Sequence, residues 1–258
     1  MNDHLIENLA DDLIRSRRRG QPVTITEELR ALDLADAYRV QERVVAAQIS
    51  DGGGPIGWKL SGTQGPEPTR GVLPATALLP DGAVIALDGS NGLLVEAELL
   101  LRVVDELGPR PSSDELAAAV EVAAALEIPQ SRFRDWWPAG GAPNVTLPLL
   151  VADNAAAFRV VAATTWHRLT VAELAEVTCT LTLPDGVTHQ GTAQNVYGSP
   201  LNALAWLVED LHSRDLQVPR GAVISTGTFT PPSHAMPGRF VAEFSRVGAV
   251  SATFTRAG

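Results

Sequence analysis

Two glutamates stand inside one long apolar run. Residues 93–104 read Leu-Leu-Val-Glu-Ala-Glu-Leu-Leu-Leu-Arg-Val-Val, a pattern that favours a buried strand. Side chains alternate along a strand, so Glu96 and Glu98 point to the same, otherwise apolar face. Burying two unpaired carboxylates is costly, and each raises the pKa of the other. The fold must therefore supply a cation to this face or turn it toward solvent.

A divalent cation removes both penalties, because carboxylate oxygens are ligands that Mg²⁺, Mn²⁺ and Ca²⁺ prefer. Glu127 ends a second apolar run and is a third candidate ligand. We expect it at the end of a helix over residues 113–126, since Pro129 stops a helix. Glu127 has an alternative role, which is to pair with Arg132 or Arg134. For the first two glutamates the alternative is a strand face open to solvent.

Lys59 lies in the short strand-like run Gly57-Trp58-Lys59-Leu60. A lysine usually lies on a solvated face. Beside a metal-bound anion, its charge would stabilise developing negative charge, or a lowered pKa would serve proton transfer. Two interpretations are also open for the pair Trp136-Trp137, which either lines a substrate pocket or packs in the core.

Charge and composition limit the partners. The chain of 258 residues has 30 acidic and 20 basic side chains, a net charge of −10, which opposes binding to nucleic acid or to an anionic membrane. Arg15, Arg17, Arg18 and Arg19 close the first helical segment and could hold a phosphate, but cations there also complement the helix dipole, so no site is assigned. A single cysteine, an acidic start and no long apolar window predict a cytoplasmic protein.

The order of elements predicts an α+β fold in one domain, residues 1–258. A helical region, residues 1–55, precedes a mainly antiparallel β body, residues 56–258, in which Asp185-Gly186 marks a hairpin and residues 200–212 a helix. Strands and helices do not alternate as a doubly wound sheet requires. No zinc-hydrolase, nucleophile-elbow or nucleotide-binding motif occurs. The expected strands are residues 56–60, 83–87, 93–104, 177–183, 222–226, 240–244 and 250–254.

Six motifs occur in one order over nearly the whole chain. Together they resemble the 2-keto-4-pentenoate hydratase and 4-oxalocrotonate decarboxylase family, in the fumarylacetoacetate hydrolase superfamily. The motifs are Gly57-Trp58-Lys59-Leu60, Glu96-Ala97-Glu98, Ala125-Leu126-Glu127 with Ser131-Arg132-Phe133, Val151-Ala152-Asp153-Asn154-Ala155, Gly198-Ser199-Pro200-Leu201-Asn202 and Ser225-Thr226-Gly227-Thr228.

The resemblance implies a mixed β-roll of the fumarylacetoacetate hydrolase C-terminal-domain type, with an N-terminal helical region. It also implies Mg²⁺ or Mn²⁺ bound by the three glutamates, with Lys59 beside the metal. Lys59 and Asn154 are the expected catalytic residues. The expected substrate-binding residues are Arg70, Trp136, Thr226, Gly227 and Thr228.

The family acts on 2-hydroxydienoates and 2-oxo acids from the degradation of aromatic rings. Their carboxylate and 2-oxygen chelate the cation, which stabilises an enolate. We expect a hydratase. A decarboxylase, tautomerase or carbon–carbon lyase is the alternative, and a catalytically idle partner subunit is a third. The expected assembly is a homo-oligomer, with a related decarboxylase as a further partner.

Two departures from the family pattern bear on the reaction. The loop over residues 64–71 is shorter and places Thr69 and Arg70 where the family has an acidic residue and a phenylalanine. Ala156 stands where a serine often follows the Ala-Asp-Asn-Ala motif. An arginine in this loop would receive a second carboxylate, which favours a dicarboxylic substrate.

Overall fold

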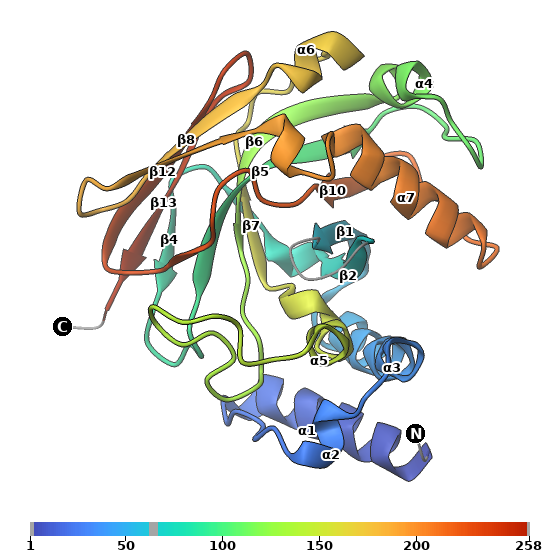
Figure 1. The fold of residues 1–258 in the computed structure, drawn as a ribbon, viewed down its shortest axis with the longest axis vertical. Helices are drawn as coiled ribbons and strands as arrows, with labels where there is room; N and C mark the ends of the chain where they lie inside the picture. The colour runs from blue at the N-terminus through green and yellow to red at the C-terminus, as the bar shows by residue number, and fades with distance from the viewer. Residues whose placement is uncertain (1–2, 62–66, 257–258) are drawn as a thin grey trace.

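Three helices form the N-terminal region, which the sequence predicts to be helical. The structure, a computed structural model, describes residues 3–61 and 67–256. Side-chain caps begin two of the helices, since the Thr26 hydroxyl accepts from the Leu29 N–H and the Asp33 carboxylate from the Asp36 N–H. The helices lie at one end of the molecule, opposite α4 (Ser113–Ala118) and α6 (Val171–Ala175) (Figure 1). They are α1 (Asp3–Arg19), α2 (Glu27–Arg30) and α3 (Leu34–Gly52).

The larger sheet has the strand order β2-β1-β10-β5-β6-β7-β3, with β11 added to β5. Most of its neighbours are antiparallel, but β1 with β10 and β3 with β7 are parallel pairs. This sheet is therefore mixed. Its strands are β1 (Pro55–Ser61), β2 (Thr69–Pro74), β3 (Leu78–Pro80), β5 (Leu94–Val103), β6 (Val120–Ile128), β7 (Arg159–Ala162), β10 (Val223–Ser225) and β11 (Ser233–His234).

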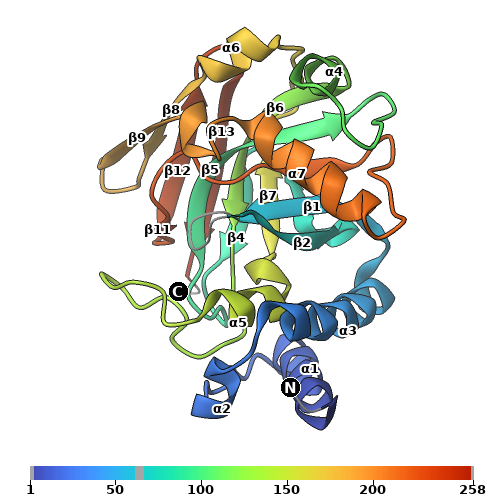
Figure 2. The ribbon, with the colours of Figure 1, turned by 45° about the vertical axis from the view of Figure 1, so that its right-hand side comes forward.

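A second sheet, of order β4-β13-β12-β8-β9, packs on one face of the first (Figure 2). Its β8–β9 hairpin turns at Asp185-Gly186, where Gly186 has φ +86°, so the predicted hairpin is confirmed. Helix α7 (Pro200–His212) matches the predicted one. The strands are β4 (Ala83–Ala86), β8 (Thr178–Thr182), β9 (Thr188–Thr192), β12 (Gly238–Phe244) and β13 (Gly248–Thr255). The remaining helical segments are α5 (Leu147–Ala152), η1 (Ala75–Ala77), η2 (Asn154–Ala156) and η3 (Ala193–Asn195).

The two faces of the larger sheet have different surroundings. Alternate residues such as Leu99 on β5 and Val122 on β6 join the core between the two sheets, together with Phe240 of β12. Glu96, Glu98 and Glu127 occupy the intervening positions, so they share the opposite face. The apolar layer between the sheets thus orients the carboxylates away from it.

The helix predicted over residues 113–126 is wrong in its second half. A capping box at Ser112 and Glu115 starts α4 as expected, but the helix ends at Ala118, and Val120 begins β6. The alanine-rich run favours a helix locally. Its pairing with β5 over eight residue pairs, with both faces buried, overrides that preference. None of the helices in the described residues is long and apolar enough to cross a membrane.

Candidate metal centre

The three glutamates expected to converge lie together on β5 and β6. Glu96 and Glu127 are direct cross-strand partners, and Glu98 follows two residues along the same face. One carboxylate oxygen of each glutamate lies within 4.8 Å of the others. Glu98 and Glu127 are buried, whereas Glu96 is partly exposed and marks the open side of the cluster. Glu127 reaches this position from a strand, not from a helix end.

Lys59 is the cation of this cluster. Its Nζ lies 3.1 Å from Glu127 Oε1, and both side chains are buried. Strand β1 places it there, because Lys59 pairs in register with Ser225 of β10, the strand next to β5. Lys59 is also the chain's only lysine, since every other basic residue is an arginine. Lys59 therefore does not occupy the solvated position that is usual for a lysine. Glu127 pairs with Lys59 and not with Arg132 or Arg134, the two alternative partners.

Burial raises the pKa values of all three carboxyls, and repulsion by neighbouring carboxylates adds to this effect for Glu96 and Glu98. Burial and then the charge of Glu127 raise the pKa of Glu96 to about 7. Burial, then the charges of Glu127 and Glu96, raise the pKa of Glu98 well above its ordinary value. Burial also raises the pKa of Glu127, against the opposing effect of Lys59. Burial alone would lower the pKa of Lys59, but the charges of the glutamates outweigh it and raise that pKa.

Ser225 and Gly227 hold Glu98 in place. The Ser225 hydroxyl donates to Glu98 Oε2 at 2.5 Å, and the Gly227 N–H donates to the same oxygen at 3.0 Å. Gly227 has φ +110°, a conformation that favours glycine. The sequence motif containing Gly227 pointed to this turn, but the role of Ser225 was missed. The only signal was its place at the start of that motif.

The residues present fit a divalent cation. Glu98 Oε1 and Glu127 Oε2 are buried and have no hydrogen-bond donor among the described residues. A buried carboxylate oxygen without a donor is costly, and a bound cation satisfies it. An all-oxygen donor set is the one that Mg²⁺, Mn²⁺ and Ca²⁺ prefer.

Asn154 lies against β2 and does not contact the carboxylates. Its amide N–H groups donate to Val72 O at 2.9 Å and Gln48 Oε1 at 3.1 Å, while its Oδ1 accepts from the Val72 N–H at 2.7 Å. Asn154, Ala155 and Ala156 all have φ between 51° and 56°. The turn lies so close to β2 that a Cβ on Gly71 would come within 2.3 Å of Asn154 O. Asn154 therefore braces the strand that pairs with the Lys59 strand.

Arg70 lies on the other face of the β1–β2 ribbon. It pairs in register with Leu60, the neighbour of Lys59, so its side chain points away from the glutamates. Its Nε donates to Asp210 on α7 at 2.6 Å, and its guanidinium lies 5.0 Å from the centre of the Tyr38 ring. The structure thus does not bring Arg70 to the carboxylates. Residues 64–66 of its loop lie outside the described residues.

Trp136 and the two threonines have structural contacts. The Trp136 indole N–H donates to the carbonyls of Asn91 and Gly92, and the ring is buried, so this tryptophan packs in the core. Thr226 donates to Leu99 O, and Thr228 donates to Thr230 O. Thr228 also lines a cavity of about 280 Å³, together with Gly227 and residues 194–198.

Sequence relatives confirm the resemblance read from the motifs. The chain is 28% identical over 247 residues to 2-keto-4-pentenoate hydratase 2 of Dechloromonas aromatica, covering 91% of this chain and 92% of the relative. It is 27% identical to 4-oxalocrotonate decarboxylase of Pseudomonas putida, covering 89% of each chain. It is also 26% identical to 2-oxo-hept-4-ene-1,7-dioate hydratase of Escherichia coli, covering 92% and 93%. No protein-family model matches.

Solved structures share the fold. 4-Oxalocrotonate decarboxylase from Pseudomonas putida G7, complexed with magnesium and adipate, superposes with a TM-score of 0.86 at 23% identity and covers 99% of each chain. Fumarylpyruvate hydrolase from Pseudomonas aeruginosa, in complex with Mn²⁺ and pyruvate, gives 0.56 at 16% identity over 78% of this chain and 89% of its own. The chain therefore shares the mixed α/β fold of these enzymes.

Proposed function

We propose that this protein is a metal-dependent hydratase of 2-hydroxy-2,4-dienoates and related 2-oxo-enoic acids. The observation that carries the proposal is the cluster of three glutamates and the chain's only lysine, gathered on one sheet face. Hydratases at 26–28% identity, named for 2-keto-4-pentenoate, 2-oxo-hept-4-ene-1,7-dioate and 2-hydroxyhexa-2,4-dienoate, support the substrate class. We further propose that the fold is the β-roll of the fumarylacetoacetate hydrolase C-terminal-domain type. In this proposal the protein is a cytoplasmic homo-oligomer that takes part in the breakdown of aromatic compounds.

Glu96, Glu98 and Glu127 would hold Mg²⁺ or Mn²⁺. When bound, the cation supplies Lewis acidity toward a substrate that chelates through its carboxylate and 2-oxygen. Three carboxylates leave coordination positions for those two oxygens. Ser225 and Gly227 keep Glu98 aimed at the site, so the ligand set is preorganised by the strands themselves.

Lys59 acts as a fixed positive charge in this proposal. Its raised pKa among the glutamates keeps Nζ protonated at neutral pH, which favours a stabilising cation over a general base. A protonated amine held by a buried ion pair stabilises negative charge that develops on the substrate oxygens. The brace of Asn154 on β2 then serves to position the neighbouring Lys59 strand.

A decarboxylase is the second candidate, because a 4-oxalocrotonate decarboxylase is 27% identical over 89% of this chain. Such a substrate carries a second carboxylate. Arg70 was the expected partner for that group, but it is already paired with Asp210. Within this structure, that contact favours the monocarboxylic hydratase reaction.

One assay separates the candidates. The purified protein with Mg²⁺ is mixed with 2-hydroxypenta-2,4-dienoate, and loss of the dienoate absorbance is followed. A product heavier by one water identifies the hydratase. Carbon dioxide release from 4-oxalocrotonate identifies the decarboxylase instead. Mg²⁺ binding without turnover of either substrate would contradict both and indicate the idle partner subunit.

A further inference from the structure

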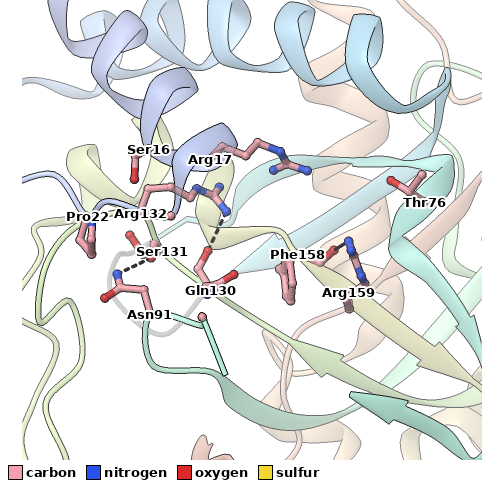
Figure 3. Close-up of a pocket in the computed structure, with 12 residues that line it drawn as sticks. Ser16, Arg17, Pro22, Thr76, Asn91, Gln130, Ser131, Arg132, Phe158 and Arg159 are labelled. Carbon is pink, nitrogen blue, oxygen red and sulfur yellow. Dashed lines mark hydrogen bonds between the residues drawn. The ribbon is translucent and has the colours of Figure 1, made fainter. Parts of the chain in front are cut away.

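A cavity of about 250 Å³ lies away from the metal centre, where the end of α1 meets the larger sheet. Its walls come from the end of α1, η1, the segment after β6 and the start of β7 (Figure 3). Neither Lys59 nor any of the three glutamates lines it. We call it the arginine pocket. The lining residues that matter for its chemistry are Arg17, Asn91, Gln130, Arg132, Phe158 and Arg159.

Three arginines and no acidic residue line this pocket. Arg132 is neutralised by Asp153, with Nε donating to Oδ1 at 2.6 Å. Among the described residues, Arg17 and Arg159 have no carboxylate within 4.0 Å. Arg159 instead donates to Phe158 O at 3.0 Å. In a chain with a net charge of −10, two arginines without carboxylate partners beside one cavity are a notable local excess of positive charge.

Arg17 also has an unmet hydrogen bond. Its Nη1 is buried and has no acceptor among the described residues. Burial, followed by the charge of Arg132, lowers the pKa of Arg17 to about 10. Burial likewise lowers the pKa of Arg159. Both guanidinium groups are thus destabilised in their charged form, and an anion bound in the pocket would oppose that effect.

We propose that the arginine pocket binds a small oxyanion, either a phosphate or a carboxylate, through Arg17 and Arg159. Guanidinium groups present paired N–H donors that match the oxygens of both anions. Asn91 and Gln130 also line the pocket (Figure 3), and the Asn91 amide already donates to the carbonyls of Ser131 and Phe133. Arg132, held by Asp153, forms a fixed part of the wall, so the positive charge available to the anion comes from Arg17 and Arg159.

The position of this pocket also explains why the sequence alone indicates no ligand site at the arginines of α1. A helix end favours cations on its own account, so Arg17 alone indicates no ligand. The second and third arginines come from segments far away in the chain, Arg132 after β6 and Arg159 at the start of β7. Because the anion would bridge α1 to the sheet, its binding should raise the melting temperature.

The test compares the wild type with an Arg17→Met/Arg159→Met double variant. Calorimetry with inorganic phosphate, at ionic strength held constant with sodium chloride, should show saturable binding to the wild type and a loss of affinity of about tenfold or more in the double variant. Arg19→Met is the matched control, because Arg19 ends the same helix, is exposed and does not line the pocket. It should bind phosphate as the wild type does.

A second arm replaces phosphate with succinate and identifies which oxyanion binds more tightly. Neither substituted arginine has an ion pair to lose, so the double variant should fold, and the single Arg159→Met variant provides a second measure. The proposal is overturned if the wild type shows no saturable binding of either anion up to about 10 mM. It is also overturned if the double variant and the Arg19→Met control respond alike.

Discussion

The metal centre and the arginine pocket each bring several charges of one sign close together, but different structural elements carry these charges. The glutamates stand on paired strands, and two of them are fully buried, so they cannot move apart or become hydrated. The arginines come from a helix end, a loop and a strand start, and Arg17 and Arg159 remain partly exposed. The first arrangement stores electrostatic repulsion that a divalent ligand relieves, whereas the second leaves flexible side chains for a weaker ligand.

Substitution of Arg132 should have the largest effect on stability, because the charge of this arginine is balanced by buried Asp153. Arg132→Met should lower the free energy of unfolding by about 3–5 kcal/mol, since it leaves buried Asp153 without its partner. Urea denaturation measures this loss. Arg134→Met, exposed two residues away, is the control and should change stability by less than about 0.5 kcal/mol. Equal, small losses in both variants would show that the ion pair has no structural role.

Glu98→Gln should differ from Arg132→Met, because it should weaken metal binding without lowering stability. Removing one charged ligand should weaken Mg²⁺ binding by about 100-fold, measured by calorimetry. The stability of the metal-free protein should not fall, because the amide oxygen still accepts from Ser225 and a repelling charge is gone. Glu121→Gln serves as the control, since Glu121 lies on β6 but pairs with Arg102. Undiminished Mg²⁺ binding by Glu98→Gln would reject the ligand assignment.

Lys59→Met tests the one cation inside the acidic region. With Mg²⁺ saturating, kcat on the dienoate should fall by about two orders of magnitude, the usual effect of losing one preorganised electrostatic group. The methionine keeps the length of the side chain and removes its charge. Melting temperature in the presence of Mg²⁺ should stay near that of the wild type. Full turnover by this variant would show that the reaction takes its positive charge from elsewhere.

Per pH unit, the contribution of Glu96 to the pH dependence of stability should be the smallest effect. The pKa of Glu96 is raised from 4.5 to about 7, so the folded, metal-free protein binds this proton more tightly than the unfolded chain. The resulting stability is present below the unfolded pKa and is lost as pH rises through the folded one. Urea denaturation with EDTA should show a decline between about pH 5 and pH 7, to which Glu96 contributes at most about 1.4 kcal/mol per pH unit. Glu96→Gln should remove that contribution, and saturating Mg²⁺ should flatten the decline.

The parts of the site that sequence predicted are those with local signals. Glu96 and Glu98 share a face because a strand has a period of two, and the apolar run around them identifies that strand. Glu127 was placed on the wrong element, since the pairing of β6 with β5 is non-local and outweighs the helical preference of alanine. The support of Glu98 by Ser225 depends on strands far apart in sequence, as does the arginine pocket, and no local pattern encodes such contacts.

Because the chain has a single lysine, chemical labelling of that side chain can measure local opening of the fold. Reagents that acylate amines leave guanidinium groups intact, so Lys59 offers them the only side-chain amine, and it is 3% exposed and protonated. Labelling therefore requires the sheet to open locally and the amine to lose its proton. The rate at which mass spectrometry detects an acyl group on Lys59 would then measure how often this part of the folded molecule opens, without any engineered probe.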